Sequence, residues 1–339
     1  MLATRQLAVM LRSGVPLVRA LEVVQGNDDE GLNRAFEEIA QRVSQGVKLS
    51  IAMQRHPLIF ARIYTVMVRI GESTGGLVSS LEVLAIWLER DQGLRAKVVK
   101  ALTYPAFVLA LTVVLTFLVM WQVIPPFLQM FRQSGAVLPL PTRLLMLIAD
   151  GVRQPLLWLL LGGGAYGYFE LLRRRWQSEE GACEIYRAFQ RIPVLGWMLT
   201  SASLSRWAMS LEAMMSAGVD IQTSLRLAGQ AAGNPRLARD GKEAARALEQ
   251  GDDLSIHLER QNEIYPRCVV HLVKAGEESS RLPAMLRRCA EIYGQELEFQ
   301  VELLGAALEP LLLSSVAVIV GFVLVAIFLP MYSLIDRLG

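Results

Sequence analysis

Residues 69–77 read RIGESTGGL, and adding 205 to each number gives residues 274–282, which read KAGEESSRL. Both stretches keep a Gly-Glu pair, then short polar residues and a Leu. Upstream and downstream of each, apolar residues recur at three- and four-residue steps, as on one face of a helix. The pattern predicts a turn between two helices, in which Gly71 ends the first helix in a left-handed conformation and Ser73 or Thr74 caps the second.

The same spacing relates other parts of the chain. GVKLSI at 46–51 matches GDDLSI at 251–256, and with an offset of 204 SGVPLVRALEVV at 13–24 matches AGVDIQTSLRLA at 217–228. So many coincidences in one register predict a duplicated module. Each copy is expected to be a small antiparallel helical bundle, because helix-breaking residues separate short amphipathic segments and strand patterns are absent. In the first copy the expected breaks lie near Gly14-Val15-Pro16, Gly26-Asn27-Asp28, Gly46, His56-Pro57 and Gly71.

Residues 71–75 also fit G-x-S-x-G, the nucleophile elbow of serine hydrolases, which needs a strand before it and a helix after it. The repeat argues against this alternative, because Ser73 becomes Glu278 and Gly75 becomes Ser280 in the second copy. A phosphate-binding loop would need a Lys-Ser/Thr after its glycines, which is missing. Neither the cysteines nor the histidines have metal-ligand spacing, so no catalytic residue, cofactor or metal is expected. They are Cys183, Cys268, Cys289, His56, His257 and His271.

With 53% hydrophobic residues and a mean hydropathy of +0.36, the chain combines membrane and aqueous parts. Residues 101–124 lack Asp, Glu, Lys, Arg and His, as do residues 310–331 of a second expected span at 307–331, and both spans are long enough to cross a bilayer of about 30 Å. A third span is expected at 154–172, where Glu170 lies near the end and Arg173-Arg174-Arg175 follows. The predicted fold is therefore all-α, with two homologous cytoplasmic antiparallel helical bundles and three transmembrane helices.

Basic residues before the first span and after the second place these flanks in the cytoplasm. The expected cytoplasmic modules are 1–100 and 173–306, with periplasmic segments at 125–153 and 332–339 and a cytoplasmic N-terminus. No cleavable signal peptide is expected, because an amphipathic pattern starts almost at once. The last helix of the first module is expected to continue toward the first span, so that a tilt of the bundle would be passed to the bilayer.

Three acidic residues near the end of the first module, Glu82, Glu89 and Asp91, could line a cation site. A solvated face in which they pair with Arg90 and Arg95 is the favoured alternative. Glu72 and Glu277 are retained by both copies, where a carboxylate could accept amides at a helix start, so a structural role is expected. A transporter would normally bury charged residues in its spans to bind an ion, and the two stronger spans have none, so a transporter or channel is only the second candidate function. Liposome flux assays would separate it from a scaffold.

The chain resembles the GspF/PilC family, the inner-membrane platform proteins of type IV pilus assembly and type II secretion. The resemblance covers nearly the whole chain and rests on these pieces: LAVMLRSGVPLVRALEVV, GESTGGL, KVVKALTYPAFVL, VIPPFLQMFRQSGAVLP, AGEESSRL and EPLLLSSVAVIVGFVLVAIFLPMY. It implies a non-enzymatic membrane scaffold, as a homo-oligomer in lipid. The implied partners are a hexameric cytoplasmic assembly ATPase, pilin or pseudopilin subunits and other inner-membrane assembly proteins, without nucleic acid.

Two departures from the family pattern limit the transfer. The chain begins almost directly at the first module, where the family usually has an extra cytoplasmic stretch, and the second copy lacks the closing glycine of the turn. Type IV pilus and type II secretion both stay open. The expected site positions are the turns (Gly71, Glu72, Gly76, Leu77, Gly276, Glu277, Leu282), the module starts (Gly14, Pro16, Gly218) and the membrane and periplasmic motifs (Tyr104, Pro105, Pro125, Phe127, Leu138, Pro139, Pro330).

Overall fold

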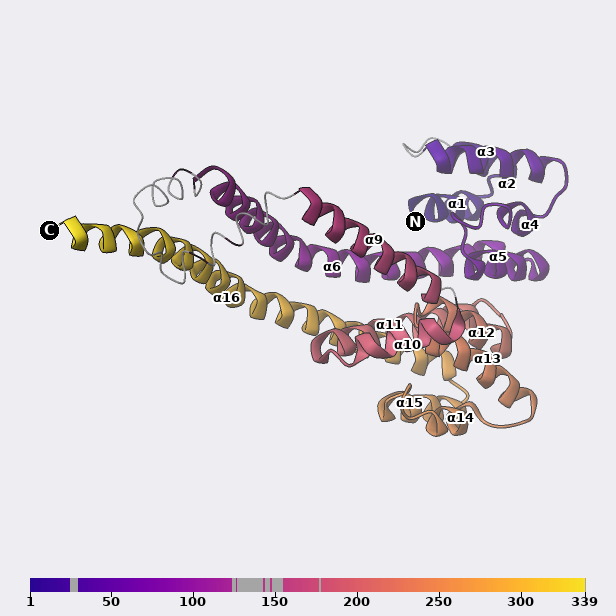
Figure 1. Cartoon of the computed structure of the whole chain (residues 1–339). Coiled ribbons are helices and arrows are strands. Elements are labelled where there is room, and N and C mark those ends of the chain that lie inside the picture. Colours follow the sequence, from indigo (N-terminus) through magenta and orange to yellow (C-terminus); the bar gives the residue numbers. More distant parts are fainter. Residues whose placement is uncertain are drawn as a thin grey trace. The chain divides into compact units, whose positions relative to one another are not determined.

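The computed structural model describes residues 1–24, 30–123, 126, 143, 147, 155–176 and 178–338 (Figure 1). Over these residues the regular elements are all helical and no strand occurs, which confirms the all-α prediction. The chain divides into two compact units. The first contains Met1–Lys97 and Glu179–Gln300, and the second contains Val98–Ser178 and Val301–Gly339.

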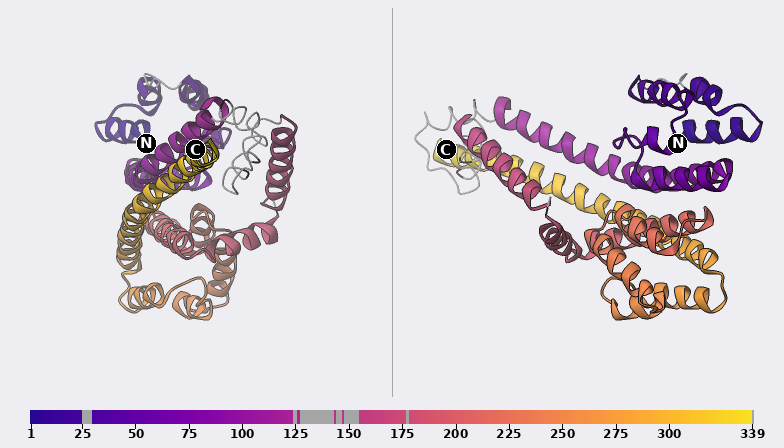
Figure 2. Two further views of the ribbon diagram at one scale, coloured as in Figure 1. Left: turned by 60° about the vertical axis from the view of Figure 1, so that its left-hand side comes forward. Right: turned by 90° about the vertical axis from the view of Figure 1, so that its right-hand side faces the viewer.

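The first unit holds two sets of helices, seen from two further directions in Figure 2. The first set is α1 (Leu2–Arg12), α2 (Leu17–Val24), α3 (Glu30–Ser44), α4 (Leu49–Met53), α5 (Arg62–Thr74) and the start of α6 (Leu77–Leu118). The second set is α10 (Glu179–Gln190), α11 (Pro193–Ser216), α12 (Ile221–Ala231), α13 (Pro235–Glu249), α14 (Leu254–Arg260), α15 (Arg267–Glu278) and the start of α16 (Leu282–Leu338). In the second unit, η1 (Val119–Val123) is a π-helical turn and α9 is Pro155–Trp176.

Helix boundaries recur at the spacing of the sequence repeat. The starts of α3, α4, α5 and α6 plus 205 give the starts of α13, α14, α15 and α16. The left-handed residues that follow the helices recur as well: Gly14 and Gly218 both have φ +82°, and Gly46 and Gly251 have φ +86° and +93°. Glycine suits these positions because a side chain disfavours positive φ.

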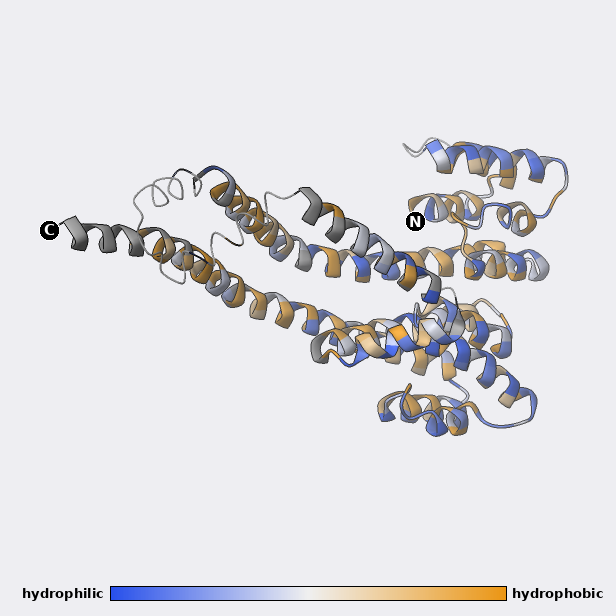
Figure 3. Ribbon diagram, viewed as in Figure 1, coloured by the Kyte–Doolittle hydropathy of each residue, from blue (hydrophilic) through white to orange (hydrophobic). Residues whose placement is uncertain are grey.

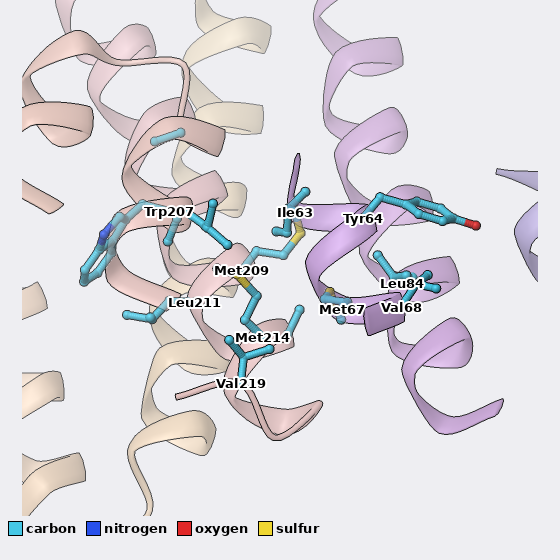
Figure 4. Close-up of a cluster of buried hydrophobic side chains, with 14 of the residues drawn as sticks. Ile63, Tyr64, Met67, Val68, Leu84, Trp207, Met209, Leu211, Met214 and Val219 are labelled. Atoms are coloured by element: carbon cyan, nitrogen blue, oxygen red, sulfur yellow. The ribbon is translucent and has the colours of Figure 1, made fainter. Parts of the chain in front are cut away.

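The two helix sets share one hydrophobic core, which the sequence analysis did not anticipate. Leu7 of α1 and its counterpart Leu211 of α11 are both fully buried, as are Leu81 of α6 and Leu286 of α16. The buried cluster is continuous from one set to the other. Figure 4 shows the side chain of Met209, from α11, directed toward Ile63 of α5.

Two helices, Leu77–Leu118 and Leu282–Ala326, are long and apolar enough to cross a membrane. Figure 3 shows hydrophobic residues along the later part of α6 and the middle of α16. A single helix from Leu77 to Leu118 confirms the expectation that the last helix of the first set continues into the first apolar stretch. The third expected span falls on α9, which is helical over Pro155–Trp176 but does not meet the same criterion among the described residues.

Candidate functional site

Glu72 caps the N-terminus of a neighbouring helix. Its side chain, in the last turn of α5, accepts hydrogen bonds from the backbone N–H of Leu49 (2.5 Å) and of Ser50 (3.2 Å), the first two residues of α4. The hydroxyl of Ser50 donates to the same carboxylate at 2.5 Å. The first amides of a helix have no partner within it, and a negative charge there is favoured by the helix dipole. Glu72 therefore anchors α4 to α5.

Glu277 makes the same contact in the second set. It accepts from the backbone N–H of Leu254 at 2.8 Å and of Ser255 at 3.0 Å, at the start of α14. The Leu-Ser pair that both copies contain is thus the pair of amides that each glutamate binds. The expected structural role of the two glutamates agrees with this geometry.

The glycine before each glutamate has a different role from the one expected. Gly71 lies within α5, not at its end, and the left-handed residue that ends α5 is Gly75, with φ +75°. A Cβ on Gly71 would lie 2.9 Å from the Cα of Leu77, and a Cβ on Gly276 would lie 2.9 Å from the Cα of Leu282. Each glycine therefore lets the helix that follows pass close to α5 or α15, and the prediction that Gly71 is left-handed is wrong.

The hydroxyl groups of this turn also differ from expectation. Ser73 and Thr74 are helical, and both donate to the carbonyl of Ile70 at 2.9 Å, so they satisfy the end of α5 and do not cap α6. Gly76 precedes α6, and its carbonyl accepts from the N–H of Ser80. Because the segment before Ser73 is a helix and not a strand, the residue does not sit on a nucleophile elbow.

The module starts lie at matching helix ends. Gly14 follows α1 and Gly218 follows α11, and in both the next residue donates to the carbonyl five positions back: Val15 to Met10 and Val219 to Met214. This is the hydrogen-bond pattern of a Schellman motif. The carbonyl of Pro16 accepts from the N–H of Ala20 at the start of α2.

The acidic residues of α6 are paired with arginines. Glu82 pairs with Arg12, and Glu89 lies 2.5 Å from Arg5, so α1 is tied to α6. No group of His, Cys, Asp or Glu with the arrangement of a metal site occurs among the described residues. The favoured expectation agrees only in part: the carboxylates pair with arginines, but the partners of Glu82 and Glu89 come from α1 and not from Arg90, and Asp91 is buried, not solvated.

Asp91 joins the two helix sets. Its carboxylate is buried and lies 2.9 Å from Arg95 of its own helix and 3.0 Å from Nε of Arg206 on α11. One turn away, Trp87 Nε1 donates to the hydroxyl of Ser210 at 3.1 Å. No sequence pattern identified Arg206 or Ser210, because a contact between repeats leaves no periodic signal in either.

The second set contains a buried polar network that has no equivalent at the matching described positions of the first set. The carboxylate of Asp240 is 2.9 Å from His257 Nε2 and accepts from the hydroxyl of Tyr265 at 2.6 Å. Burial raises the pKa of Tyr265 well above its ordinary value, as does the neighbouring charge of Asp240. The equivalent positions for His257 and Tyr265 in the first set are Ala52 and Phe60, both buried and apolar.

The membrane motif is described only in part. Tyr104 and Pro105 lie inside α6, where Tyr104 is exposed and Pro105 does not interrupt the helix. Pro330 lies within α16. The expected motif residues Pro125, Phe127, Leu138 and Pro139 are outside the described residues.

These features define a class: an all-helical protein in which two related helix sets share a core and each ends in a candidate membrane-spanning helix. A family model described as type II secretion system (T2SS), protein F, matches residues 3–125 and 207–330. The second segment starts 204 residues after the first and ends 205 residues after it, which are the offsets of the sequence repeat. The chain belongs to this family.

Named relatives come from both kinds of machinery. The chain is 34% identical to the type IV pilus assembly protein PilC of Thermus thermophilus, over 99% of this chain and 82% of that protein. It is 31% identical to the type IV pilus assembly protein TapC of Aeromonas hydrophila, over 100% of this chain and 82% of that protein. It is 30% identical to the type II secretion system protein F of Xanthomonas campestris pv. campestris, over 99% of this chain and 82% of that protein.

Proposed function

We propose that this chain is a non-enzymatic inner-membrane platform of a type IV pilus or type II secretion machine. In this proposal it couples a cytoplasmic hexameric assembly ATPase to the extraction and polymerisation of pilin or pseudopilin subunits, together with other inner-membrane assembly proteins. Family membership and the names of the relatives support the machinery. The proposed topology has three spans, with α9 as the second, both helix sets in the cytoplasm and a cytoplasmic N-terminus.

One observation carries the coupling. The helix that closes each set, α6 in the first and α16 in the second, runs on without a break into an apolar stretch long enough to span a bilayer. A continuous helix resists bending, so a displacement of a set by a partner would be transmitted along it. The ends of α5 and α15 are held to α4 and α14 by Glu72 and Glu277, which makes each set stiff where its long helix begins.

A matched pair of variants tests the coupling. Ala96 and Val99 are exposed positions of α6 between the first set and the first apolar stretch. Ala96→Gly with Val99→Gly weakens the helix there, by about 1 kcal/mol per glycine relative to alanine, whereas Val99→Ala alone keeps it helical. In a strain that lacks its own platform protein, we expect the glycine variant to insert into the membrane but to assemble few pili or secrete little, and the alanine variant to work.

Partner binding is tested separately. The full chain in detergent should retain a pilus-type ATPase and a pilin-like subunit in pull-down experiments, with both variants binding equally. Absence of both partners would contradict the platform. Normal assembly by the glycine variant would contradict the coupling through α6 while leaving the platform intact. Substrate-specific flux through liposomes containing the chain would instead support the transporter alternative.

A further inference from the structure

The outer face of α1 and α2 exposes apolar side chains around a depression of about 400 Å³. Leu2, Val9 and Val23 on this face are 62%, 56% and 60% exposed. The residues that matter below are Leu2, Arg5, Gln6, Val9, Met10 and Val23, and we name them the α1–α2 surface. Large apolar side chains gathered in one patch mark an interaction site more often than isolated ones do.

The second helix set shows what this face binds. Adding 204 converts Arg5, Gln6 and Val9 into Met209, Ser210 and Ala213 of α11. These three are buried, with exposures of 3%, 0% and 2%. Ser210 is covered by its hydrogen bond with Trp87 of α6, and Met209 is directed toward Ile63 of α5 (Figure 4). In the second set, therefore, the equivalent face is buried against the helix pair α5–α6.

The repeat equivalent of that helix pair is α15–α16, and its matching positions are uncovered. Adding 205 to Ile63, which is 4% exposed beside Met209, gives Cys268, which is exposed. Adding 205 to Leu94, which is half-buried, gives Phe299, which is 57% exposed. Among the described residues, the molecule thus contains one occupied contact between repeats and a more exposed copy of each of its two halves.

We propose that the α1–α2 surface of one copy binds the α15–α16 pair of a second copy of this chain, in the arrangement that the two helix sets already adopt within one chain. Charge complementarity supports this occupant. Met209 and Ile86 line the same depression between the two sets. Their repeat equivalents are Arg5 and Glu291, so two apolar side chains are replaced together by a cation and an anion.

Within one chain, Arg5 and Glu291 already have ion-pair partners. Both pairs are partly exposed to solvent, so each charge can also contact the opposite charge of a second copy. Arg5 lies 2.5 Å from Glu89, and Glu291 lies 3.1 Å from Arg288, with these side chains 34–65% exposed. The contact joins different faces of the two copies, so it is heterologous and repeats from copy to copy into a ring or an open array. The proposal rests on the proposed function only in assuming that copies assemble in one membrane, and its test involves no ATPase or pilin.

Cysteine cross-linking tests the pairing of faces. Ala213 and Val83 line the depression between the sets, and their equivalents are Val9 and Arg288. In a Cys268→Ser background, which removes the exposed native thiol, one tagged full-length copy carries Val9→Cys and a second, differently tagged copy carries Arg288→Cys. We expect a disulfide-linked product that contains both tags when the copies are mixed in detergent, and no dimer from either copy alone. Dimers of the Val9→Cys copy alone would show that the face pairs with itself and would overturn the proposal.

A charge exchange provides the second readout, measured as oligomeric mass by light scattering in detergent. Arg5→Glu and Glu291→Arg should each weaken self-association about tenfold, and the chain carrying both changes should recover it. Val9→Asp should also weaken it, whereas Ile51→Asp, at an equally exposed apolar position of α4, should not. If Val9→Asp leaves the mass unchanged, or if the double charge exchange fails to restore it, this surface does not bind a second copy. Neither result depends on whether the ATPase binds.

Discussion

Glu72 and Glu277 each hold two backbone amides of a neighbouring helix, and both are half-buried. Removing the carboxylate leaves the first amides of α4 or α14 without their partner. We expect Glu72→Ala and Glu277→Ala each to lower the free energy of unfolding by about 1–3 kcal/mol. Chemical denaturation of the full chain in detergent, followed by tryptophan fluorescence, measures this. Glu278→Ala removes an exposed carboxylate next to Glu277 and should change the value by less than about 0.5 kcal/mol.

Ser280 occupies the position of Gly75 in the second set, and it is the one non-glycine residue with positive φ among those described (φ +54°). A side chain in this conformation costs about 1 kcal/mol. Ser280→Gly is therefore expected to raise the free energy of unfolding by up to about 1 kcal/mol, and Gly75→Ser to lower it by a similar amount. The control is Ser279→Gly, at φ −92°, which should not stabilise the protein. A stabilising Ser279→Gly would contradict the conformational explanation.

Tyr64 is buried in the first set, 3.2 Å from the hydroxyl of Thr4. Burial raises the pKa of Tyr64 to about 12, and the hydrogen bond with Thr4 opposes part of that rise. A raised pKa in the folded state means that the neutral phenol stabilises the fold below pH 10, and that this contribution is lost as the pH rises through 12. The loss amounts to about 3 kcal/mol for two pKa units.

Tyr64→Phe should therefore flatten the fall in unfolding free energy between pH 10 and pH 12. The difference in tyrosinate absorbance between the wild type and this variant reports the titration of Tyr64 itself. An unchanged slope in Tyr64→Phe, or titration of Tyr64 near pH 10, would show that the phenol is accessible to water.

At the scale of helices, close approach at two glycines decides how α5 meets α6 and how α15 meets α16. Gly71→Ala and Gly276→Ala would each place a Cβ 2.9 Å from backbone of the next helix. We expect each to lower the midpoint of thermal unfolding, at a cost of about 1–3 kcal/mol for the displaced backbone. Gly93→Ala in α6 meets nothing within 4 Å and should instead stabilise the helix by about 0.5–1 kcal/mol. Equal effects of Gly71→Ala and Gly93→Ala would rule out the steric explanation.

The sequence predicted these helices well, because their amphipathic pattern and their repetition are both local signals. It misplaced two roles at the turn: that of Gly71, and that of the hydroxyl groups of Ser73 and Thr74. Gly71 and Gly75 are equally able to adopt positive φ, so composition does not show which of them ends α5. The second copy held a clue, since it keeps Gly276 but replaces the other glycine by Ser280. A residue that is indispensable for close packing has to remain glycine, whereas a left-handed position tolerates serine at about 1 kcal/mol.

At the scale of the molecule, the shared core could not be predicted. Met209 and Ala213 are apolar at helical spacing, and that pattern does not distinguish contact with their own set from contact with the other set. The ion pair between Asp91 and Arg206 joins residues more than a hundred positions apart, and neither segment has a sequence pattern that predicts it. The sequence predicted two separate helical bundles. That their hydrophobic cores form one continuous cluster is visible only in the three-dimensional structure.

Because the core is continuous, the two sets should unfold together. Met53 and Leu258 are fully buried repeat equivalents, one in each set. Met53→Ala and Leu258→Ala should each cost about 2–5 kcal/mol and shift the same single transition. Circular dichroism and the fluorescence of Trp87 and Trp207 would follow it in the full chain. Two separated transitions, each sensitive to one variant alone, would show that the sets are independent.

The network around Asp240 has a consequence for how a chain with two similar halves finds its fold. If α14 and α15 exchanged places with α4 and α5, Asp240 would face the hydrocarbon of Ala52 and Phe60 in place of His257 and Tyr265. Thr4, in turn, would lose the hydroxyl of Tyr64 and face Val269. A carboxylate buried without partners is costly, so folds in which the helices of the two halves are exchanged are disfavoured during assembly of the chain. Each half thus contains a buried polar contact that its own helices satisfy and that the equivalent helices of the other half would leave without a partner.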